Sequence, residues 1–150
     1  MTNSIDDLSE AKTVFVIGSN TTVAHPIIAL EIRRAVRAGA KLIIADPRRI
    51  ELVEIAHLWL RLRPGSNVSL LGGMMRVIWD EGLVDRAFIE ERCENFEAFQ
   101  ESLAQFDLDT VERITGVPAD QIREAARLYA QNTPSSIVYA MGITQHTTGT

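Results

Sequence analysis

An aspartate and two arginines follow a short apolar run, Leu42-Ile-Ile-Ala45, as Asp46-Pro47-Arg48-Arg49. A short apolar run bounded by breakers predicts a strand buried on both faces, as in a parallel sheet. Pro47 cannot extend the ladder, so the strand ends at Asp46. Ligands of open α/β sheets bind beyond the carboxyl ends of strands, where a carboxylate suits ribose or base and arginines suit phosphate. The alternative is an ordinary turn with solvated charges.

Three other loops are predicted at the same edge of a parallel sheet: Gly18–His25, Pro64–Asn67 and Met141–His146. They are rich in the residue types that hydrogen-bond phosphates, riboses and bases. Helices that begin near Pro26 and Val68 would point free N–H groups and positive dipole ends at this edge. Together the loops predict a nucleotide-like anionic ligand, without predicting a reaction.

The familiar catalytic and phosphate-binding patterns are missing. The turn Gly18-Ser-Asn-Thr-Thr22 is neither a dinucleotide fingerprint nor a Walker A loop. The three histidines, His25, His57 and His146, are far apart in sequence and lack metal-ligand spacing. His146 is the most interesting of them, because its loop otherwise holds only small polar residues.

Alternating strands and helices must position these loops. The predicted strands are Thr13–Ile17, Lys41–Ala45, His57–Leu62 and Ser136–Tyr139, the last followed by a loop. A helix from Pro26 joins the first two strands into a right-handed βαβ unit. Another spans Val68–Glu81, where Gly72 and Gly73 each cost about 1 kcal/mol relative to alanine and so indicate close packing against a neighbour.

Residues 83–132 read as several short amphipathic helices and predict a helical insertion on one edge of the sheet. The predicted fold class is therefore α/β: a three-layer αβα, Rossmann-like domain with a mostly parallel sheet. Residues 1–150 form a single domain of common size.

Composition excludes several classes of partner. The hydrophobic fraction of 46% and charged fraction of 23% are those of a soluble globular protein. A net charge of −5 argues against nucleic acid. No apolar run approaches the roughly 20 residues of a membrane span, so no membrane contact is expected from this segment. The polar, acidic N-terminus shows no secretory signal, and we expect a cytoplasmic protein.

Seven motifs carry a resemblance over essentially the whole chain: Thr2-Asn-Ser-Ile5, Phe15-Val-Ile-Gly-Ser-Asn20, His25-Pro26, Ala45-Asp-Pro-Arg-Arg49, Leu62-Arg-Pro-Gly-Ser66, Ile114-Thr-Gly-Val-Pro118 and Tyr139-Ala-Met-Gly-Ile-Thr-Gln-His-Thr-Thr-Gly149. Each is weak alone, but in this order and spacing they resemble the catalytic subunit of molybdenum or tungsten formate dehydrogenases, which are bis(molybdopterin guanine dinucleotide) oxidoreductases. The resemblance implies the internal αβα domain that holds one guanine dinucleotide arm.

The resemblance also implies a set of cofactor-binding residues. Gly18 and Asn20 would approach the dinucleotide, and Asp46 and Arg48 would hold its guanosine end. The residues implied as lining the same nucleotide pocket are Pro64, Gly65, Ser66 and Asn67. Those implied to lie nearer the pterin and the metal are Gly142, Gln145 and His146. Family members often carry polar residues just before His25, where this chain has Val23-Ala24, so no side-chain contact is expected from that pair.

The family's other parts have no counterpart in these residues. An iron–sulfur cluster needs several cysteines, and this chain has one, Cys93. The family's metal ligand, a cysteine or selenocysteine followed by a histidine, lies upstream of this region. We therefore expect a fragment, inactive by itself, whose partners are the remaining domains of a parent chain and iron–sulfur or electron-transfer subunits. Iron–sulfur clusters would lie elsewhere in that parent.

Three other interpretations stay open. The chain could be a free-standing nucleotide-binding module with a regulatory or carrier role. It could belong to another molybdopterin oxidoreductase, such as a nitrate reductase. It could also be a structural αβα fragment that binds nothing alone, because half of each dinucleotide site would come from absent chain.

Overall fold

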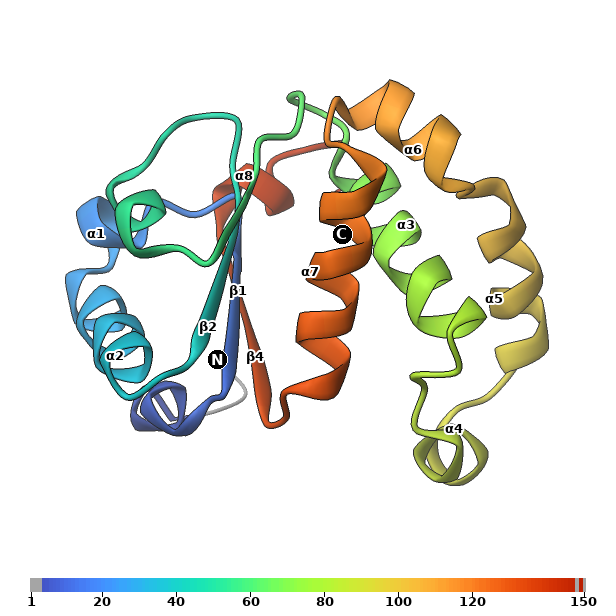
Figure 1. The fold of residues 1–150 in the computed structure, drawn as a ribbon, viewed down its shortest axis with the longest axis horizontal. Coiled ribbons are helices and arrows are strands. Elements are labelled where there is room, and N and C mark those ends of the chain that lie inside the picture. Colours follow the sequence, from blue (N-terminus) through green and yellow to red (C-terminus); the bar gives the residue numbers. More distant parts are fainter. Residues whose placement is uncertain (1–3, 148, 150) are drawn as a thin grey trace.

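The computed structural model describes residues 4–147 and 149; Thr2 and Asn3 of the first motif and Thr148 of the last lie outside them. Within the described residues, the strands are β1 (Thr13–Ile17), β2 (Lys41–Ala45), β3 (Leu58–Leu60) and β4 (Ser135–Tyr139). They form one parallel sheet in the order β3-β2-β1-β4. Helices cover both faces (Figure 1), so the predicted α/β fold with a parallel sheet is confirmed.

The helices are α1 (Thr21–Ala24), α2 (Pro26–Arg37), α3 (Asn67–Asp80), α4 (Arg86–Arg92), α5 (Phe96–Ser102), α6 (Leu108–Thr115), α7 (Ala119–Gln131) and α8 (Met141–Thr144), with 3-10 turns η1 (Asp6–Glu10), η2 (Glu51–Ile55) and η3 (Leu103–Gln105). Helices α1 and α8 form where the sequence predicted only loops. None of the described helices is long and apolar enough to cross a membrane.

Strand β1 supplies side chains to two separate cores, which explains its unbroken apolar run. All five of its residues are buried. Phe15 and Ile17 pack into the core beneath α3 and α7, whereas Val14 and Val16 pack into the core beneath α2. A strand covered on both faces needs no polar alternation, and this is the arrangement expected of a parallel sheet.

Helix α2 follows from the residues that begin it and line one side of it. Pro26 occupies its first turn, where a missing N–H costs no hydrogen bond. Ile32 and Ala35 are buried against the sheet. The helix therefore leads the chain from the end of β1 back to the start of β2, and the two strands pair with Thr13 beside Lys41.

The two glycines of α3 allow the following helices to approach it closely. An added Cβ at Gly72 would lie 2.5 Å from the Phe106 ring, and one at Gly73 would lie 2.9 Å from a methyl of Val111. The prediction of close packing at these glycines is confirmed. Further along α3, the Trp79 ring lies 5.6 Å from that of Phe96 and anchors α5.

The predicted helical segment divides into two parts. Helices α4 to α6 lie on the far side of α3 from the sheet (Figure 1). Helix α7 instead covers the sheet beside α3, with Ile122 and Ala125 fully buried in the same core as Phe15. The outlying part therefore ends with α6, and α7 belongs to one of the three layers rather than to an insertion.

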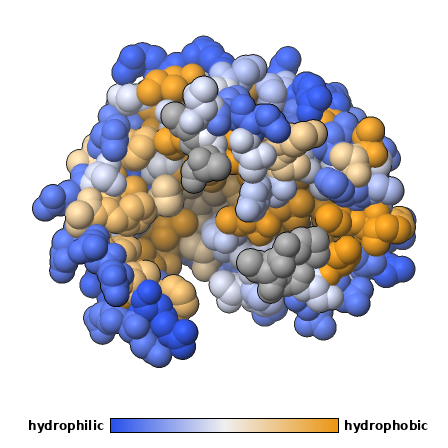
Figure 2. Space-filling view, turned by 180° about the vertical axis from the view of Figure 1, so that it is seen from behind, coloured by the Kyte–Doolittle hydropathy of each residue, from blue (hydrophilic) through white to orange (hydrophobic). Residues whose placement is uncertain are grey.

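Strand β4 is the least covered strand of the sheet. None of its residues is buried, and the Ile137 and Tyr139 side chains are 48% and 61% exposed. Seen from behind, Figure 2 shows apolar surface gathered across the middle of the molecule, with hydrophilic surface around it. The sheet is thus closed over β1 and β2 and open along β4.

Candidate functional site

A cavity of about 150 Å³ opens at the carboxyl edge of the sheet. It is formed by the ends of β1 and β2, the loop between β3 and α3, and the region of α8. The lining residues are Gly18, Ala45, Asp46, Pro47, Arg48, Leu62, Arg63, Pro64, Asn67, Gly142 and His146. Parallel strands bring their carboxyl ends to one edge, so loops far apart in sequence meet here, as the sequence predicted.

Asp46 is the most constrained polar residue of the cavity. It is 1% exposed. Its Oδ1 atom accepts hydrogen bonds from the Arg48 backbone N–H, at 2.8 Å, and from Arg48 Nε, at 3.2 Å. Its Oδ2 atom is buried and has no hydrogen-bond partner among the described residues. A buried carboxylate oxygen without a donor is costly, so this atom is suited to accept a hydrogen bond from a ligand.

Local hydrogen bonds explain why Asp46 sits where it does. Its bond to the amide two residues ahead closes a turn that aspartate commonly forms at strand ends. The Trp59 indole N–H donates to the Asp46 carbonyl oxygen at 2.9 Å and fixes the backbone from the next strand. The Arg48 side chain is 70% exposed, which leaves most of its guanidinium donors available to an anion.

The loop before α3 is held by Arg63. The Arg63 backbone N–H donates to the Thr115 carbonyl oxygen at 2.8 Å, and its Nη1 donates to the Arg113 carbonyl oxygen at 2.6 Å. These carbonyls end α6, where the negative end of the helix dipole favours a cation. Arg63 lines the cavity, although it was not among the predicted site residues. The sequence feature that could have indicated it is its position within the Leu62–Ser66 motif.

The amino end of α3 also faces this region through Asn67. Ser66 is its N-cap residue, but the Ser66 hydroxyl donates to the Arg63 carbonyl oxygen at 2.6 Å and makes no side-chain cap. The first N–H groups of α3 are therefore without a side-chain acceptor among the described residues, an arrangement that suits an anionic ligand.

The β1 and β4 loops touch through their backbones. The Gly142 N–H donates to the Gly18 carbonyl oxygen at 2.9 Å. Gly142 lies within α8, and His146, just after this helix, lines the same cavity as Asp46 and Arg48. Gly142 and His146 thus line the same cavity as the residues expected at the guanosine end, and their implied place nearer the pterin stays a prediction.

A second group of unsatisfied polar atoms lies directly after Gly18. Ser19 Oγ, Asn20 Oδ1, Thr21 Oγ1 and Thr22 Oγ1 are buried and have no partner among the described residues. None of these residues lines the cavity. Of these four residues, the resemblance implied a cofactor contact for Asn20 alone, because the small hydroxyl residues of a turn give no sign of whether they will be buried.

The predicted site residues are only partly brought together. Seven line the cavity: Gly18, Asp46, Arg48, Pro64, Asn67, Gly142 and His146. Asn20, Gly65, Ser66 and Gln145 do not. Gly65 and Gln145 are exposed, and Ser66 is buried. Among residues 4–147 and 149, no group of three or more His, Cys, Asp or Glu side chains is placed to hold a metal ion.

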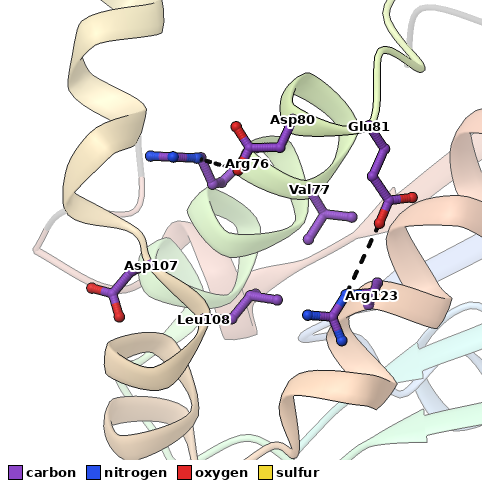
Figure 3. Close-up of a pocket in the computed structure, with 7 residues that line it drawn as sticks. All are labelled: Arg76, Val77, Asp80, Glu81, Asp107, Leu108 and Arg123. Carbon is purple, nitrogen blue, oxygen red and sulfur yellow. Dashed lines mark hydrogen bonds and ion pairs between the residues drawn. The ribbon is translucent and has the colours of Figure 1, made fainter.

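A larger cavity of about 330 Å³ lies between α3, α6 and α7, with mostly charged lining (Figure 3). Four of its five charged residues form ion pairs within the lining, and the fifth, Asp107, accepts a hydrogen bond from the Thr110 backbone N–H at 2.9 Å. Arg76 Nε lies 2.6 Å from Asp80, and Arg123 lies 4.0 Å from Glu81. A hydrogen bond and the positive charge of Arg127 hold the pKa of the Glu81 carboxyl below its usual value. No residue that lines this cavity has a buried side-chain polar atom without a partner, as far as the described residues show.

The chain matches the family model of the molybdopterin oxidoreductases over residues 1–150. Formate dehydrogenase H of Escherichia coli is 43% identical over 145 residues, which are 97% of this chain and 20% of that protein. The F420-dependent formate dehydrogenase 1 subunit alpha of Methanococcus maripaludis is 42% identical, over 99% of this chain and 22% of that protein.

A solved structure of acetylene hydratase from Pelobacter acetylenicus superposes with a TM-score of 0.82 and 36% identity, over 89% of this chain and 18% of that one. The chain spans about a fifth of the length of the relatives it matches. With the family model covering every residue, the chain belongs to the molybdopterin oxidoreductase family.

Proposed function

We propose that this chain is a cofactor-binding domain of a formate dehydrogenase, and that the cavity at the sheet edge takes the guanosine diphosphate end of a molybdopterin guanine dinucleotide. The two formate dehydrogenases named above are 42–43% identical to it, and the acetylene hydratase structure is 36% identical. The observation that carries the site is the buried, unpartnered Oδ2 atom of Asp46.

The residues of the cavity fit the chemistry of such a group. Guanine presents two adjacent N–H donors on its pairing edge, and a carboxylate is an acceptor with room for more than one donor. The exposed guanidinium of Arg48 and the uncapped amino end of α3 suit the diphosphate. The Asp46 carboxylate would therefore accept hydrogen bonds from the base or the ribose, while Arg48 and Asn67 lie toward the phosphates.

The size of the cavity indicates that the chain supplies one wall of a larger site. Ligand pockets commonly enclose about 300–1,000 Å³, and this cavity holds about 150 Å³. A chain that spans a fifth of its relatives would share the dinucleotide with other domains of its parent. Iron–sulfur clusters and electron-transfer subunits would belong to that parent too.

The chemistry would belong to the cofactor. When bound, the molybdopterin group supplies the molybdenum or tungsten centre at which the full-length parent oxidises formate to CO2. The residues described here would bind the nucleotide, orient it and keep its position fixed relative to the sheet.

Titration of the ¹⁵N-labelled chain with GDP tests the proposal by NMR. We expect amide shifts at Gly18–Asn20, Asp46–Arg49 and Pro64–Asn67, and weaker shifts with ADP, because adenine lacks the paired N–H donors of guanine. Equal shifts with both would indicate a general nucleotide module. An absence of shifts at millimolar GDP would contradict a nucleotide site in this chain and favour a purely structural role.

A further inference from the structure

Gly18 follows β1, Gly142 lies in α8 after β4, and the two residues meet beside the cavity. We propose that these two residues, here called the glycine clasp, hold α8 against the end of β1 and thereby set the position of His146 as a ligand-contacting residue. The inference rests on the proposed function, because it takes the occupant of the cavity to be a nucleotide.

Both members of the glycine clasp lack room for a side chain. A Cβ added to Gly18 would lie 2.7 Å from the Gly142 carbonyl carbon, and one added to Gly142 would lie 2.5 Å from the Gly18 oxygen. Real Cβ atoms essentially never approach other atoms within 3.0 Å. Because the opposing atoms are backbone, they cannot rotate away, and any side chain must push the two loops apart.

The sheet topology gives this contact its importance. Strands β2 and β3 lie on one side of β1 and β4 lies on the other, so the chain reverses direction across the sheet between β1 and β4. Ligands of such folds bind in the crevice at that point. Here the glycine clasp joins the two loops, and the cavity lies toward β2 and the loop before α3.

From the β4 side, the cavity-lining residues are Gly142 and His146. Helix α8 is short and largely exposed, with Met141 67% exposed and Ile143 packed against the core. The His146 N–H reaches back to the Ile143 carbonyl oxygen at 3.3 Å, so His146 moves with α8. The position of α8 therefore decides whether the imidazole faces the ligand.

Alanine substitutions separate contact from backbone strain. Gly142 does not have a positive φ and lies within α8, where alanine is intrinsically preferred over glycine, so Gly142→Ala tests the contact alone. Gly82 has a φ of +67°, close to the +59° of Gly18, and nothing within 4 Å of an added Cβ. Gly82→Ala is thus the control for Gly18→Ala.

GDP titration followed through the His146 imidazole signals and the backbone amides provides the measurement. In the unaltered chain, GDP should shift His146 together with Asp46–Arg49, and the Gly142 amide should exchange slowly with solvent. Gly142→Ala and Gly18→Ala should weaken GDP binding about tenfold, the loss of one hydrogen bond to a charged group. Both should abolish the His146 shift and keep the shift at Asp46, whereas Gly82→Ala should behave like the unaltered chain.

His146→Gln extends the test without disturbing the glycine clasp. This substitution should weaken GDP binding to an extent similar to that of the glycine variants, while the Gly142 amide still exchanges slowly with solvent. Shifts at Asp46–Arg49 without any at His146, or unchanged binding in Gly142→Ala, would overturn the inference and leave the proposed function standing. An absence of shifts at both places would overturn the two together.

Discussion

The two ends of α3 lie beside the two cavities, and they differ in what they leave unpaired. At the amino end, Asn67 shares the smaller cavity with Asp46, whose Oδ2 atom has no partner among the described residues. At the carboxyl end, Arg76 and Asp80 line the larger cavity and pair with each other. By volume, the larger cavity, of about 330 Å³, is the better candidate for a ligand site than the smaller one, of about 150 Å³. By unsatisfied buried hydrogen-bonding atoms, the smaller cavity is the better candidate.

The difference has a physical basis. Paired surface charges are already satisfied, and a ligand that displaced them would gain little because exposed ion pairs are individually weak. A buried acceptor without a donor carries a cost that a ligand removes when it binds. We therefore expect the proposed nucleotide in the smaller cavity, and altering one aspartate in each cavity tests that expectation.

The largest effect is expected from Asp46→Asn. This change keeps the size of the side chain but removes the charge and replaces one acceptor oxygen by a donor. Affinity for GDP should fall by about 1–3 kcal/mol, measured by NMR or calorimetric titration. Asp80→Asn makes the same chemical change in the larger cavity and should leave GDP affinity unaltered. Equal losses of GDP affinity in both variants would contradict the assignment of the nucleotide to the smaller cavity.

A smaller effect, on stability, is expected from Gly72→Ala between the two ends. Alanine favours the helix by about 1 kcal/mol, but its Cβ would meet the Phe106 ring at 2.5 Å. Overpacking of this kind commonly costs about 1–3 kcal/mol, so we expect net destabilisation in chemical denaturation. Met75→Ala, at a 39% exposed position of the same helix, is the control. A more stable Gly72→Ala chain would show that the Phe106 ring can move away from α3 at little cost.

The smallest effect concerns Glu81, in the lining of the larger cavity. Arg127 lowers the pKa of Glu81 below its ordinary value of 4.5. A carboxyl with a lowered pKa in the folded state stabilises the fold above the unfolded pKa and loses that contribution as pH falls through the folded value. The stability difference between the unaltered chain and Glu81→Gln should therefore shrink from pH 7 toward pH 3 in denaturation experiments. A constant difference would contradict the pairing.

Much of the fold could be predicted because its signals are local. The runs Thr13–Ile17 and Lys41–Ala45 became β1 and β2 with the predicted bounds, and Pro26 begins α2. Strand β3 is shorter than the predicted His57–Leu62, because its pairing with β2 covers only residues 58–60. Periodicity also gave α7 an apolar side without indicating that this side faces the sheet.

The two short helices escaped prediction for a different reason. Four residues are too few to show periodicity, and α1 begins with Thr21-Thr22 while α8 contains Gly142, all weak helix formers. For α8 a tertiary contact is visible: the Gly142 N–H donates a hydrogen bond to the Gly18 carbonyl oxygen across the sheet edge. Contacts between residues so far apart in sequence leave no pattern in either segment.

The site was predictable at its acidic centre and less so around it. Asp46 could be selected because Pro47 marks the end of its strand, and the parallel sheet explains why Gly18 and Pro64 lie nearby. Arg63 was missed because its role depends on carbonyls at the end of α6, about 50 residues later. The roles of the lining residues toward a cofactor remain predictions.

The two tryptophans have a practical consequence for optical measurements. Trp59 donates its indole hydrogen bond to the residue at the centre of the small cavity, and Trp79 stacks near Phe96 at the base of the outlying helices. Each is therefore a natural fluorophore for a different region, with emission sensitive to its own surroundings. Replacing Trp79 by phenylalanine would leave Trp59 as the one tryptophan, whose fluorescence reports on the smaller cavity. Replacing Trp59 instead would leave Trp79, whose fluorescence reports on the outlying helices. Neither measurement needs an attached dye.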